Sequence, residues 1–272
     1  MQTKTAWLVA VGALVASAGG YLVIATREPT AVEPTDSPRG LARWSGAESN
    51  PTLLAEALST ESDGAVRHTL LERAARRSDA LALFRAAWDA TDDNTVREQL
   101  LVDAARLGVL GAAGWLAEVA ASDHVLATRA GAALGTITDR RAAAELVRLG
   151  SDDGPALVRA NAVRALGSAG SAEHVPVLSR LVSDPSQPLR VRQEAALSIG
   201  HLHDPSASPG LVTALDAARA DSSANGEQLR ISLIQSLEAL GTRDAREALQ
   251  VYANGNPSRT EAAFLQRALA RR

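Results

Sequence analysis

The sequence predicts an all-α protein, and three observations support this fold class. Hydrophobic residues make up 46% of the 272 residues and aromatic residues only 3%, so the apolar mass is mostly Ala, Leu and Val. This composition suits closely packed helices. Long β-branched runs with period-two alternation, which would predict strands, are absent from the sequence. One pattern of apolar and small residues at helical spacing returns throughout the body of the chain.

The first predicted element is a transmembrane anchor in residues 1–26. Residues 6–25 carry no charge, and about twenty apolar residues are what a helix needs to cross a hydrocarbon core. Trp7 and Tyr21 lie near the ends of this run, where amphipathic aromatics favour the membrane interface. A cleaved signal peptide is the alternative, because Ala16-Ser17-Ala18 resembles a cleavage site. The anchor predicts a single-pass membrane protein with a periplasmic or extracytoplasmic body.

The second predicted element is a flexible linker in residues 27–50. Pro29, Pro34 and Pro38 interrupt a stretch of Thr, Glu, Asp, Ser and Gly that has little apolar content. Such a composition cannot build a packed core. We therefore expect the folded body to occupy residues 51–272.

The body repeats one pattern: an apolar residue, in most copies an arginine, then small residues and a glycine. The first six copies begin at Val66, Val96, Leu126, Val158, Val191 and Leu229, and a degenerate copy begins near Arg259. The first six starts are 30, 30, 32, 33 and 38 residues apart. A period of this size indicates stacked structural repeats.

A second set of helical segments lies between these copies. Most of them follow a Ser, Asp, Thr or Asn, whose side-chain oxygens cap helix N-termini; the segments are residues 52–58, 79–90, 112–122, 140–150, 172–182, 210–220 and 243–253. Each unit is therefore a helix A, a turn and a helix B. The sequence predicts about seven such antiparallel pairs, with a loop insertion at residues 216–228.

The repeated positions have structural roles in this interpretation. Val158, Ala162 and Leu166 place one apolar stripe of helix B against helix A. The glycine that follows, such as Gly167, is expected to end helix B in a left-handed conformation. An aspartate precedes most B helices, and we expect a ladder of charge-assisted bonds between the pairs Asp63 and Arg67, Asp93 and Arg97, Asp153 and Arg159, Asp184 and Arg192, and Asp221 and Arg230.

An aspartate in the turn, then Val-Arg, then A-x-x-A-L-G resembles the HEAT-like repeat family, in its short phycobilisome-lyase-like form. The resemblance covers nearly the whole body and is most typical in residues 123–200; it departs from the pattern at Ala105, Ala127 and Glu238. It implies an α-solenoid, a right-handed superhelix whose B helices line the concave face. It also implies binding rather than catalysis.

Missing residues exclude several kinds of chemistry. The chain has no cysteine, which excludes thiol nucleophiles, disulfides and thiolate zinc sites. Its one lysine is Lys4, so the body offers no lysine for a phosphate-binding loop or a Schiff base. The formal net charge of −3 and the scarcity of aromatics argue against a nucleic-acid partner.

Candidate binding residues lie on the side of helix B opposite the apolar stripe. They are polar and of mixed charge: His68, Glu72, Glu98, Gln99, Arg129, Asn161, Arg164, Gln193, Glu194 and Gln235. The plainer alternative is that these residues are only solvated. Trp88 and Trp115 fall in A helices, where we expect packing.

Two arrangements of titratable residues are set aside. His201, His203 and Asp204 fall at a helix end, where capping is the better explanation than a metal site. Glu72 and Glu98, on adjacent repeats, would resemble a catalytic acid–base pair, but nothing in the sequence marks a pocket around them.

The sequence thus predicts a membrane-tethered, non-catalytic scaffold that binds another protein through the concave face of its B helices. We expect no cofactor and no bound metal. The alternative is a phycobilin-lyase-like enzyme or accessory factor that acts on a chromophore or a protein partner; an exported body argues against it. Self-association is a third hypothesis.

Overall fold

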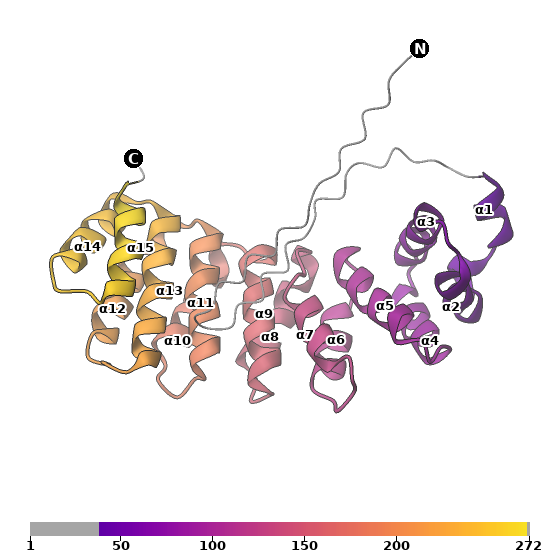
Figure 1. Ribbon diagram of the computed structural model, residues 1–272, viewed down its shortest axis with the longest axis horizontal. Helices are drawn as coiled ribbons and strands as arrows, with labels where there is room; N and C mark the ends of the chain where they lie inside the picture. The colour runs from indigo at the N-terminus through magenta and orange to yellow at the C-terminus, as the bar shows by residue number, and fades with distance from the viewer. Residues whose placement is uncertain (1–37, 271–272) are drawn as a thin grey trace, which may run out of the picture. The chain divides into compact units, whose positions relative to one another are not determined.

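The structure, a computed structural model, describes residues 38–270, and all of their regular elements are helical (Figure 1). Helix α1 (Pro38–Arg43) precedes the repeats. The A helices are α2 (Pro51–Thr60), α4 (Ala80–Asp89), α6 (Ala112–Ala120), α8 (Ala143–Ser151), α10 (Val175–Ser183), α12 (Ser208–Ala218) and α14 (Arg243–Ala253). The B helices are α3 (Gly64–Ala75), α5 (Asn94–Arg106), α7 (Ala127–Leu134), α9 (Ala156–Ala169), α11 (Leu189–Leu202), α13 (Ala224–Leu240) and α15 (Arg259–Ala270). Short 3-10 helices are η1 (Ala47–Ser49), η2 (Arg140–Ala142), η3 (Ala172–His174) and η4 (Pro205–Ala207).

The helices form two layers. Each A helix packs against the B helix that follows it, and successive B helices from α5 to α15 pack against one another. The pairs follow each other in a row in Figure 1, as they do in the sequence. The predicted all-α fold is confirmed for residues 38–270, and the arrangement is consistent with an α-solenoid of seven helix pairs.

The predicted membrane anchor lies outside the described residues. Within residues 38–270, no helix combines the length and the apolar character that crossing a membrane requires. The predicted linker is described only from residue 38 onward.

The folded part begins earlier than residue 51, which corrects the predicted linker. Residues 38–50 contain α1 and η1, and Trp44 and Ala47 are buried there. The indole Nε1 of Trp44 donates a hydrogen bond to Glu61 Oε2 over 2.9 Å. Proline content suggested an unfolded segment, but Pro38 is the first residue of α1, where its missing N–H costs nothing.

The predicted loop insertion at residues 216–228 is also corrected. Helix α12 ends at Ala218 and α13 begins at Ala224, so the additional residues lengthen α13 to 17 residues. The Ser223 side chain accepts a hydrogen bond from the Gly226 N–H and thereby caps the new helix start.

Two of the repeated glycines do not end their B helices, contrary to our expectation. Gly167 and Gly200 lie inside α9 and α11, with none of the positive φ that a left-handed end requires. A Cβ at Gly167 would lie 2.9 Å from the Cα of Ser198, and one at Gly200 would lie 2.9 Å from the Cα of Ser236. These glycines therefore allow neighbouring B helices to approach closely. Gly241, with φ of 61°, does end α13 in the expected way.

Each close approach is completed by a serine hydroxyl. Ser198 Oγ donates to the Val163 carbonyl over 2.8 Å, and Ser236 Oγ donates to the Ala196 carbonyl over 2.7 Å. In both cases the accepting carbonyl belongs to the residue four positions before the glycine. The same glycine and serine arrangement thus occurs between α9 and α11 and between α11 and α13. Both serines are 1% exposed.

Replacing Gly167 with alanine should destabilise the protein by about 1–3 kcal/mol, because the new Cβ meets a backbone atom that cannot rotate away. The matched control is Gly64→Ala at the start of α3, where no atom lies within 4 Å of the new Cβ. The Gly64→Ala variant should unfold at the same urea concentration as the wild type or at a slightly higher one. Urea unfolding of the full chain, followed by circular dichroism, measures both effects. Equal midpoints for the two variants would show that Gly167 is not needed for close packing.

Candidate functional site

The surface that carries the predicted binding residues is called the B face here: the side of α3, α5, α7, α9, α11 and α13 turned away from the A helices. Seven of the ten residues are exposed or half-exposed, namely His68, Glu72, Glu98, Gln99, Arg129, Arg164 and Gln235. The other three, Asn161, Gln193 and Glu194, are buried, with exposed fractions of 2%, 8% and 3%. For these three the predicted solvent-facing position is wrong.

Their burial has a geometric cause. In the middle of the stack, a B helix has another B helix on each side, so the position three residues after its first apolar residue faces the preceding helix. Asn161 of α9 lies against Gly131 of α7 and against Gly135, which directly follows that helix; its amide donates to the Leu157 carbonyl over 2.9 Å. Glu194 of α11 accepts from Arg164 Nε of α9 over 3.0 Å.

Ion pairs between neighbouring B helices run along this face. Glu98 Oε1 lies 3.4 Å from Arg129 Nε, and Glu238 Oε2 lies 3.1 Å from Arg267 Nη2. Arg164 and Glu194 form a third pair through both carboxylate oxygens. A ladder of charge-assisted bonds therefore exists, but arginine–glutamate pairs between B helices form it.

The predicted aspartate–arginine ladder is not found within residues 38–270: none of its five pairs forms an ion pair there. The aspartates shape turns instead. Asp63 and Asp93 cap α3 and α5 by accepting the N–H of Ala65 and Thr95, each over 2.8 Å. Asp153 is exposed in its turn.

The other two aspartates of the predicted ladder also accept local hydrogen bonds. Gln187 and Ser186 donate to the Asp184 carboxylate, and these bonds lower the pKa of Asp184 to about 2. Hydrogen bonding from Ser223 lowers the pKa of Asp221. Local hydrogen bonds thus hold both carboxylates in the charged form.

The arginines of the pattern have a shared role that the sequence did not indicate. Four of them donate to a carbonyl in the last turn of the preceding A helix: Arg97 to Trp88 over 3.3 Å, Arg159 to Gly150 over 3.4 Å, Arg192 to Val182 over 2.9 Å and Arg230 to Ala218 over 2.9 Å. Carbonyls at a helix C-terminus lack partners within the helix, and a cation there also interacts favourably with the helix dipole. In the first pair, the Nε of Arg67 is buried without a hydrogen-bond partner among the described residues.

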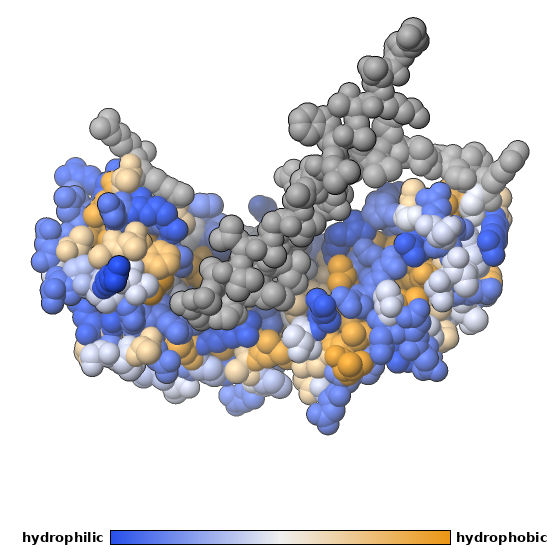
Figure 2. All heavy atoms as spheres, viewed as in Figure 1, coloured by the Kyte–Doolittle hydropathy of each residue, from blue (hydrophilic) through white to orange (hydrophobic). Residues whose placement is uncertain are grey.

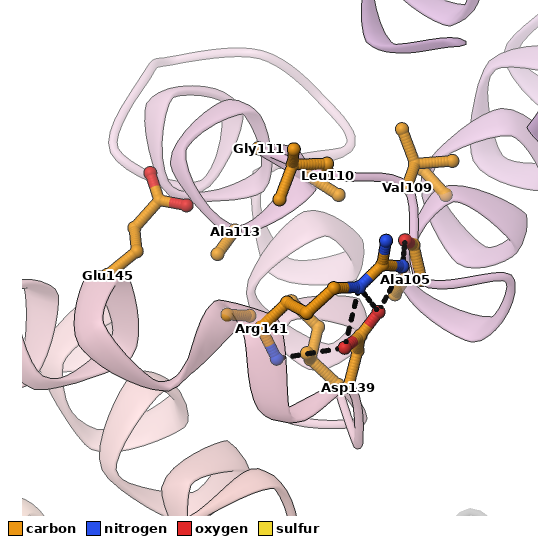
Figure 3. Close-up of a pocket in the computed structure, with 13 residues that line it drawn as sticks. Ala105, Val109, Leu110, Gly111, Ala113, Asp139, Arg141 and Glu145 are labelled. Carbon is orange, nitrogen blue, oxygen red and sulfur yellow. Dashed lines mark hydrogen bonds and ion pairs between the residues drawn. The ribbon is translucent and has the colours of Figure 1, made fainter. Parts of the chain in front are cut away.

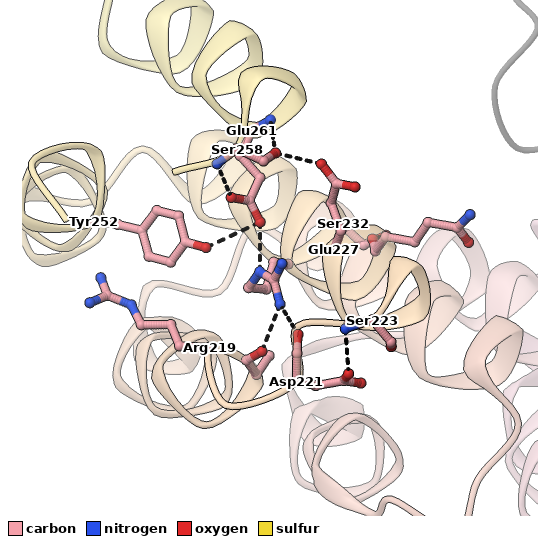
Figure 4. A network of polar contacts seen from close by, with 12 residues as sticks. Arg219, Asp221, Ser223, Glu227, Ser232, Tyr252, Ser258 and Glu261 are labelled. Carbon is pink, nitrogen blue, oxygen red and sulfur yellow. Dashed lines mark hydrogen bonds and ion pairs between the residues drawn. The ribbon is translucent and has the colours of Figure 1, made fainter. Parts of the chain in front are cut away.

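One of the two buried arginines of this set, Arg230, organises a network between the last two pairs (Figure 4). Its Nε donates to Glu261 Oε1 over 2.6 Å, and its Nη1 also donates to the Asp221 carbonyl. Tyr252 Oη donates to the same Glu261 oxygen over 3.2 Å, and the Ser258 N–H donates to the other over 2.8 Å. Every donor around the Glu261 carboxylate thus comes from a turn or helix of these two pairs.

Burial by itself would raise the pKa of Glu261, but the hydrogen bonds from Arg230 and Ser258 hold it below its ordinary value. A lowered folded-state pKa stabilises the protein above the unfolded pKa of about 4.3, and this stabilisation is lost as the pH falls through the folded-state value. At neutral pH, Glu261 therefore contributes to stability only while its guanidinium partner is present.

Arg230→Met should destabilise the protein by about 3–5 kcal/mol near neutral pH, because it leaves the Glu261 charge buried and unpaired. Without Arg230, burial should raise the pKa of Glu261, so the deficit should shrink as the pH falls towards about 4. The double variant Arg230→Met with Glu261→Gln should be more stable than the single variant. Urea unfolding at the two pH values measures both effects, and a deficit independent of pH would contradict this role of Glu261.

Hollows in the surface of the described residues include the following three. The first, in Figure 3, lies where α5, α6 and η2 meet and has a volume of about 30 Å³, too small for an organic ligand. Arg141 closes it by pairing with Asp139 over 2.6 Å and donating to the Gly108 carbonyl over 3.1 Å. Its role is therefore structural.

The two larger hollows lie on the A helices. A groove of about 600 Å³ along α8 and α10 is lined by Val147, Val177 and Leu181, with the exposed Arg180 beside them. A pocket of about 300 Å³ between α4 and α6 is lined by Trp88, Trp115 and other side chains, and we call it the aromatic pocket. Neither hollow was predicted, since no sequence motif joins residues of separate A helices.

The titratable residues that the sequence analysis rejected as metal or catalytic sites have structural roles. Asp204 caps η4 by accepting the Ser206 N–H over 3.0 Å, and His203 ends α11 with φ of 52°. Glu72 pairs with His68 over 3.2 Å. In the part of the chain that the structure describes, no group of three or more His, Asp or Glu residues is arranged to hold a metal ion.

Part of the described chain matches a known repeat family. Residues 148–224 match the family of HEAT repeats. The matched stretch runs from α8 into the first turn of α13 and overlaps the region in which the pattern is most typical. The HEAT-like character expected from the Val-Arg and A-x-x-A-L-G pattern is thus supported there. A search of curated proteins found no match.

Two solved structures are similar to the chain at low identity. Human deoxyhypusine hydroxylase, in complex with glycerol, is 19% identical with a TM-score of 0.37; the match covers 82% of this chain and 96% of the hydroxylase. The complex of CpcE and CpcF of phycocyanin lyase from a Nostoc species is 18% identical with a TM-score of 0.35. The match covers 81% of this chain and 94% of the lyase chain. At these values, neither likeness indicates what chemistry this chain performs.

The prediction that the chain is not an enzyme is overturned. It rested on the resemblance to a binding repeat and on the missing cysteine and lysine, whereas both similar structures, a hydroxylase and a lyase, are of enzymes. A repeat fold by itself does not exclude catalysis.

Proposed function

We propose that residues 38–270 form a protein-recognition domain that binds a partner through the first half of the B face. The observation that supports this is the change in exposure along the face. His68, Glu72, Glu98, Gln99 and Arg129, on α3, α5 and α7, are accessible to solvent. Most of the equivalent positions on α9 and α11 are buried between helices.

The chemistry of this surface favours a folded protein with a polar surface. Its charges have both signs, and Glu98 and Arg129 keep side-chain exposures of 38% and 53% although they form a pair. On the face shown in Figure 2, hydrophilic residues dominate and hydrophobic residues occur in small, separate patches. Mixed charges of this kind provide electrostatic complementarity, which sets the choice of partner and the rate of association more than raw affinity.

We further propose that residues 6–25 tether this domain to a membrane, with the body on the periplasmic or extracytoplasmic side. The support is the sequence: twenty residues without a charge, with Trp7 and Tyr21 near the ends. The partner would then be another protein of the same envelope, and the capture experiment below uses solubilised membranes for that reason.

Exchanging the charges of one exposed pair, in the variant Glu98→Arg with Arg129→Glu, should reduce capture of the partner at least about tenfold while keeping the pair itself intact. The full chain serves as bait, with crosslinking in detergent-solubilised native membranes. The matched control exchanges Arg243 and Glu247 of α14, which form a similar exposed pair over 2.8 Å. Equal loss of capture in both variants, or in neither, would contradict recognition by this surface.

A second candidate function is that of a phycobilin-lyase-like enzyme or accessory factor acting on a chromophore. The observation that favours it is the groove along α8 and α10, whose volume of about 600 Å³ is in the range of ligand sites. The apolar part of its lining, Val147, Val177 and Leu181, suits a flat conjugated molecule, and Arg180 offers a guanidinium for a carboxylate. The rest of the lining is polar: Ser151, Ser183 and Asp184. A linear tetrapyrrole with propionate groups has this chemistry.

Mixing the full chain with biliverdin, a linear tetrapyrrole, should shift the visible absorbance saturably. Arg180→Ala should weaken binding at least about tenfold, the usual cost of losing a charge-assisted hydrogen bond. Arg148→Ala is the control, because Arg148 is an exposed arginine of α8 that pairs with Asp152 and does not line the groove. No absorbance change, or the same affinity for both variants, would contradict a tetrapyrrole site in this groove.

A further inference from the structure

The geometry points to a second recognition site, independent of the B face: the aromatic pocket between α4 and α6 takes an arginine side chain presented by a protein partner. The sequence suggested only packing for its two tryptophans. That holds for Trp115, which is 3% exposed, but Trp88 is half-exposed and lines the pocket.

The walls of the pocket are aromatic. The indole rings of Trp88 and Trp115 lie edge to face, with centroids 5.8 Å apart and planes at 85°. The His124 ring, from the turn after α6, lies 5.1 Å from the Trp88 ring at 49°. The chain has only 3% aromatic residues, so this gathering on one surface is unusual for it. Tryptophan is the aromatic side chain that attracts cations best.

One carboxylate of the pocket has no partner. Asp89 lines the pocket and is exposed, and none of the hydrogen bonds or ion pairs of the described residues involves its side chain. Asp89 is also the last residue of α4, at the negative end of the helix dipole, where an anion is unfavourable. Neither α4 nor α6 has a basic residue in its last turn. The potential in the pocket therefore favours a cation.

The cations already nearby are each matched by an anion. Arg85 Nη2 lies 2.5 Å from Glu118 Oε2 across the pocket. Arg97 lies outside the lining, pairs with Asp92 over 3.3 Å and caps α4 through the Trp88 carbonyl. Asp89 therefore remains as the unmatched charge of the lining.

The planar guanidinium of arginine is the cation that fits best. Arginine stacks on aromatic faces and binds carboxylates through two parallel hydrogen bonds, whereas lysine acts as a point charge. The protein already shows this preference, because the guanidinium of Arg97 lies over the Trp88 ring at 5.4 Å from its centroid. A volume of about 300 Å³ is at the lower end of ordinary ligand pockets and suits one side chain.

The test uses the full chain in detergent with ¹⁵N-labelled tryptophan, and N-acetylarginine methylamide as the probe. The Trp88 indole signal is assigned by its loss in Trp88→Phe. We expect this signal to shift saturably with the probe. N-acetylcitrulline methylamide, which is neutral and nearly isosteric, should bind at least about tenfold more weakly.

Two variants separate the site from a general charge effect. Asp89→Asn should weaken binding of the arginine probe about tenfold, because it removes the unmatched carboxylate. Glu56→Gln removes an exposed carboxylate on α2 and should leave the affinity unchanged. The proposal is overturned if the arginine probe causes no shift, if the citrulline probe binds equally well, or if Asp89→Asn binds as the wild type does. Because the B face takes no part in this test, its result is independent of the capture experiment.

Discussion

The close approach of successive B helices is the constraint on which the rest of the structure depends. Gly167 and Gly200 let the backbone of the next helix come within the space that a Cβ would occupy, and Ser198 and Ser236 bond across the gap. Glycine in a helix costs about 1 kcal/mol relative to alanine, so its use at these positions must be repaid by packing. The same approach buries the polar residues between those helices, such as Glu194.

The exposure of the B face follows from where these glycines occur. Helices α7, α9 and α11 carry them, and the helix after each one carries buried polar residues, among them Asn161, Ser198 and Ser236. Helix α5 contains no glycine, and Arg129 on the helix after it stays exposed. The candidate binding residues of the first half thus stay accessible to solvent, although Asp103 of α5 is buried and pairs with Arg106. The aromatic pocket, between the second and third A helices, lies in this half as well.

Much of the fold could be predicted from the sequence, because apolar periodicity and capping residues are local signals. Seven helix pairs were expected and are present in residues 51–270. What each repeated residue does was harder to predict. Gly167 was expected to end a helix, but whether a glycine serves a turn or a close contact depends on a neighbour some thirty residues away. The sequence suggested an ion pair between Asp184 and Arg192. Instead, Asp184 accepts a hydrogen bond from Ser186 in its own turn, and Arg192 donates to the Val182 carbonyl at the end of α10.

The candidate site was predicted only in outline for the same reason. Helical position indicates which side of a B helix faces away from its A helix, and His68, Glu98 and Arg129 are exposed there as expected. It does not indicate whether another B helix covers that side, which is why Glu194 was misplaced. The aromatic pocket joins Trp88 to Trp115 and His124 across separate elements, and only the packed structure brings them together.

The hydrogen bonds from the arginines to the ends of the A helices affect the order in which the protein unfolds. Each joins a B helix to the A helix just before it, across only 9 to 12 residues of chain. A pair closed by such a short-range bond is a local unit, and in stacked repeats such units can open from an end without disturbing the middle. At the C-terminal end, the first opening must break the buried contact between Arg230 and Glu261. At the other end, Arg67 lacks the equivalent bond, so fraying should begin with α2, α3 and the preceding α1 and η1, and proceed inward one pair at a time.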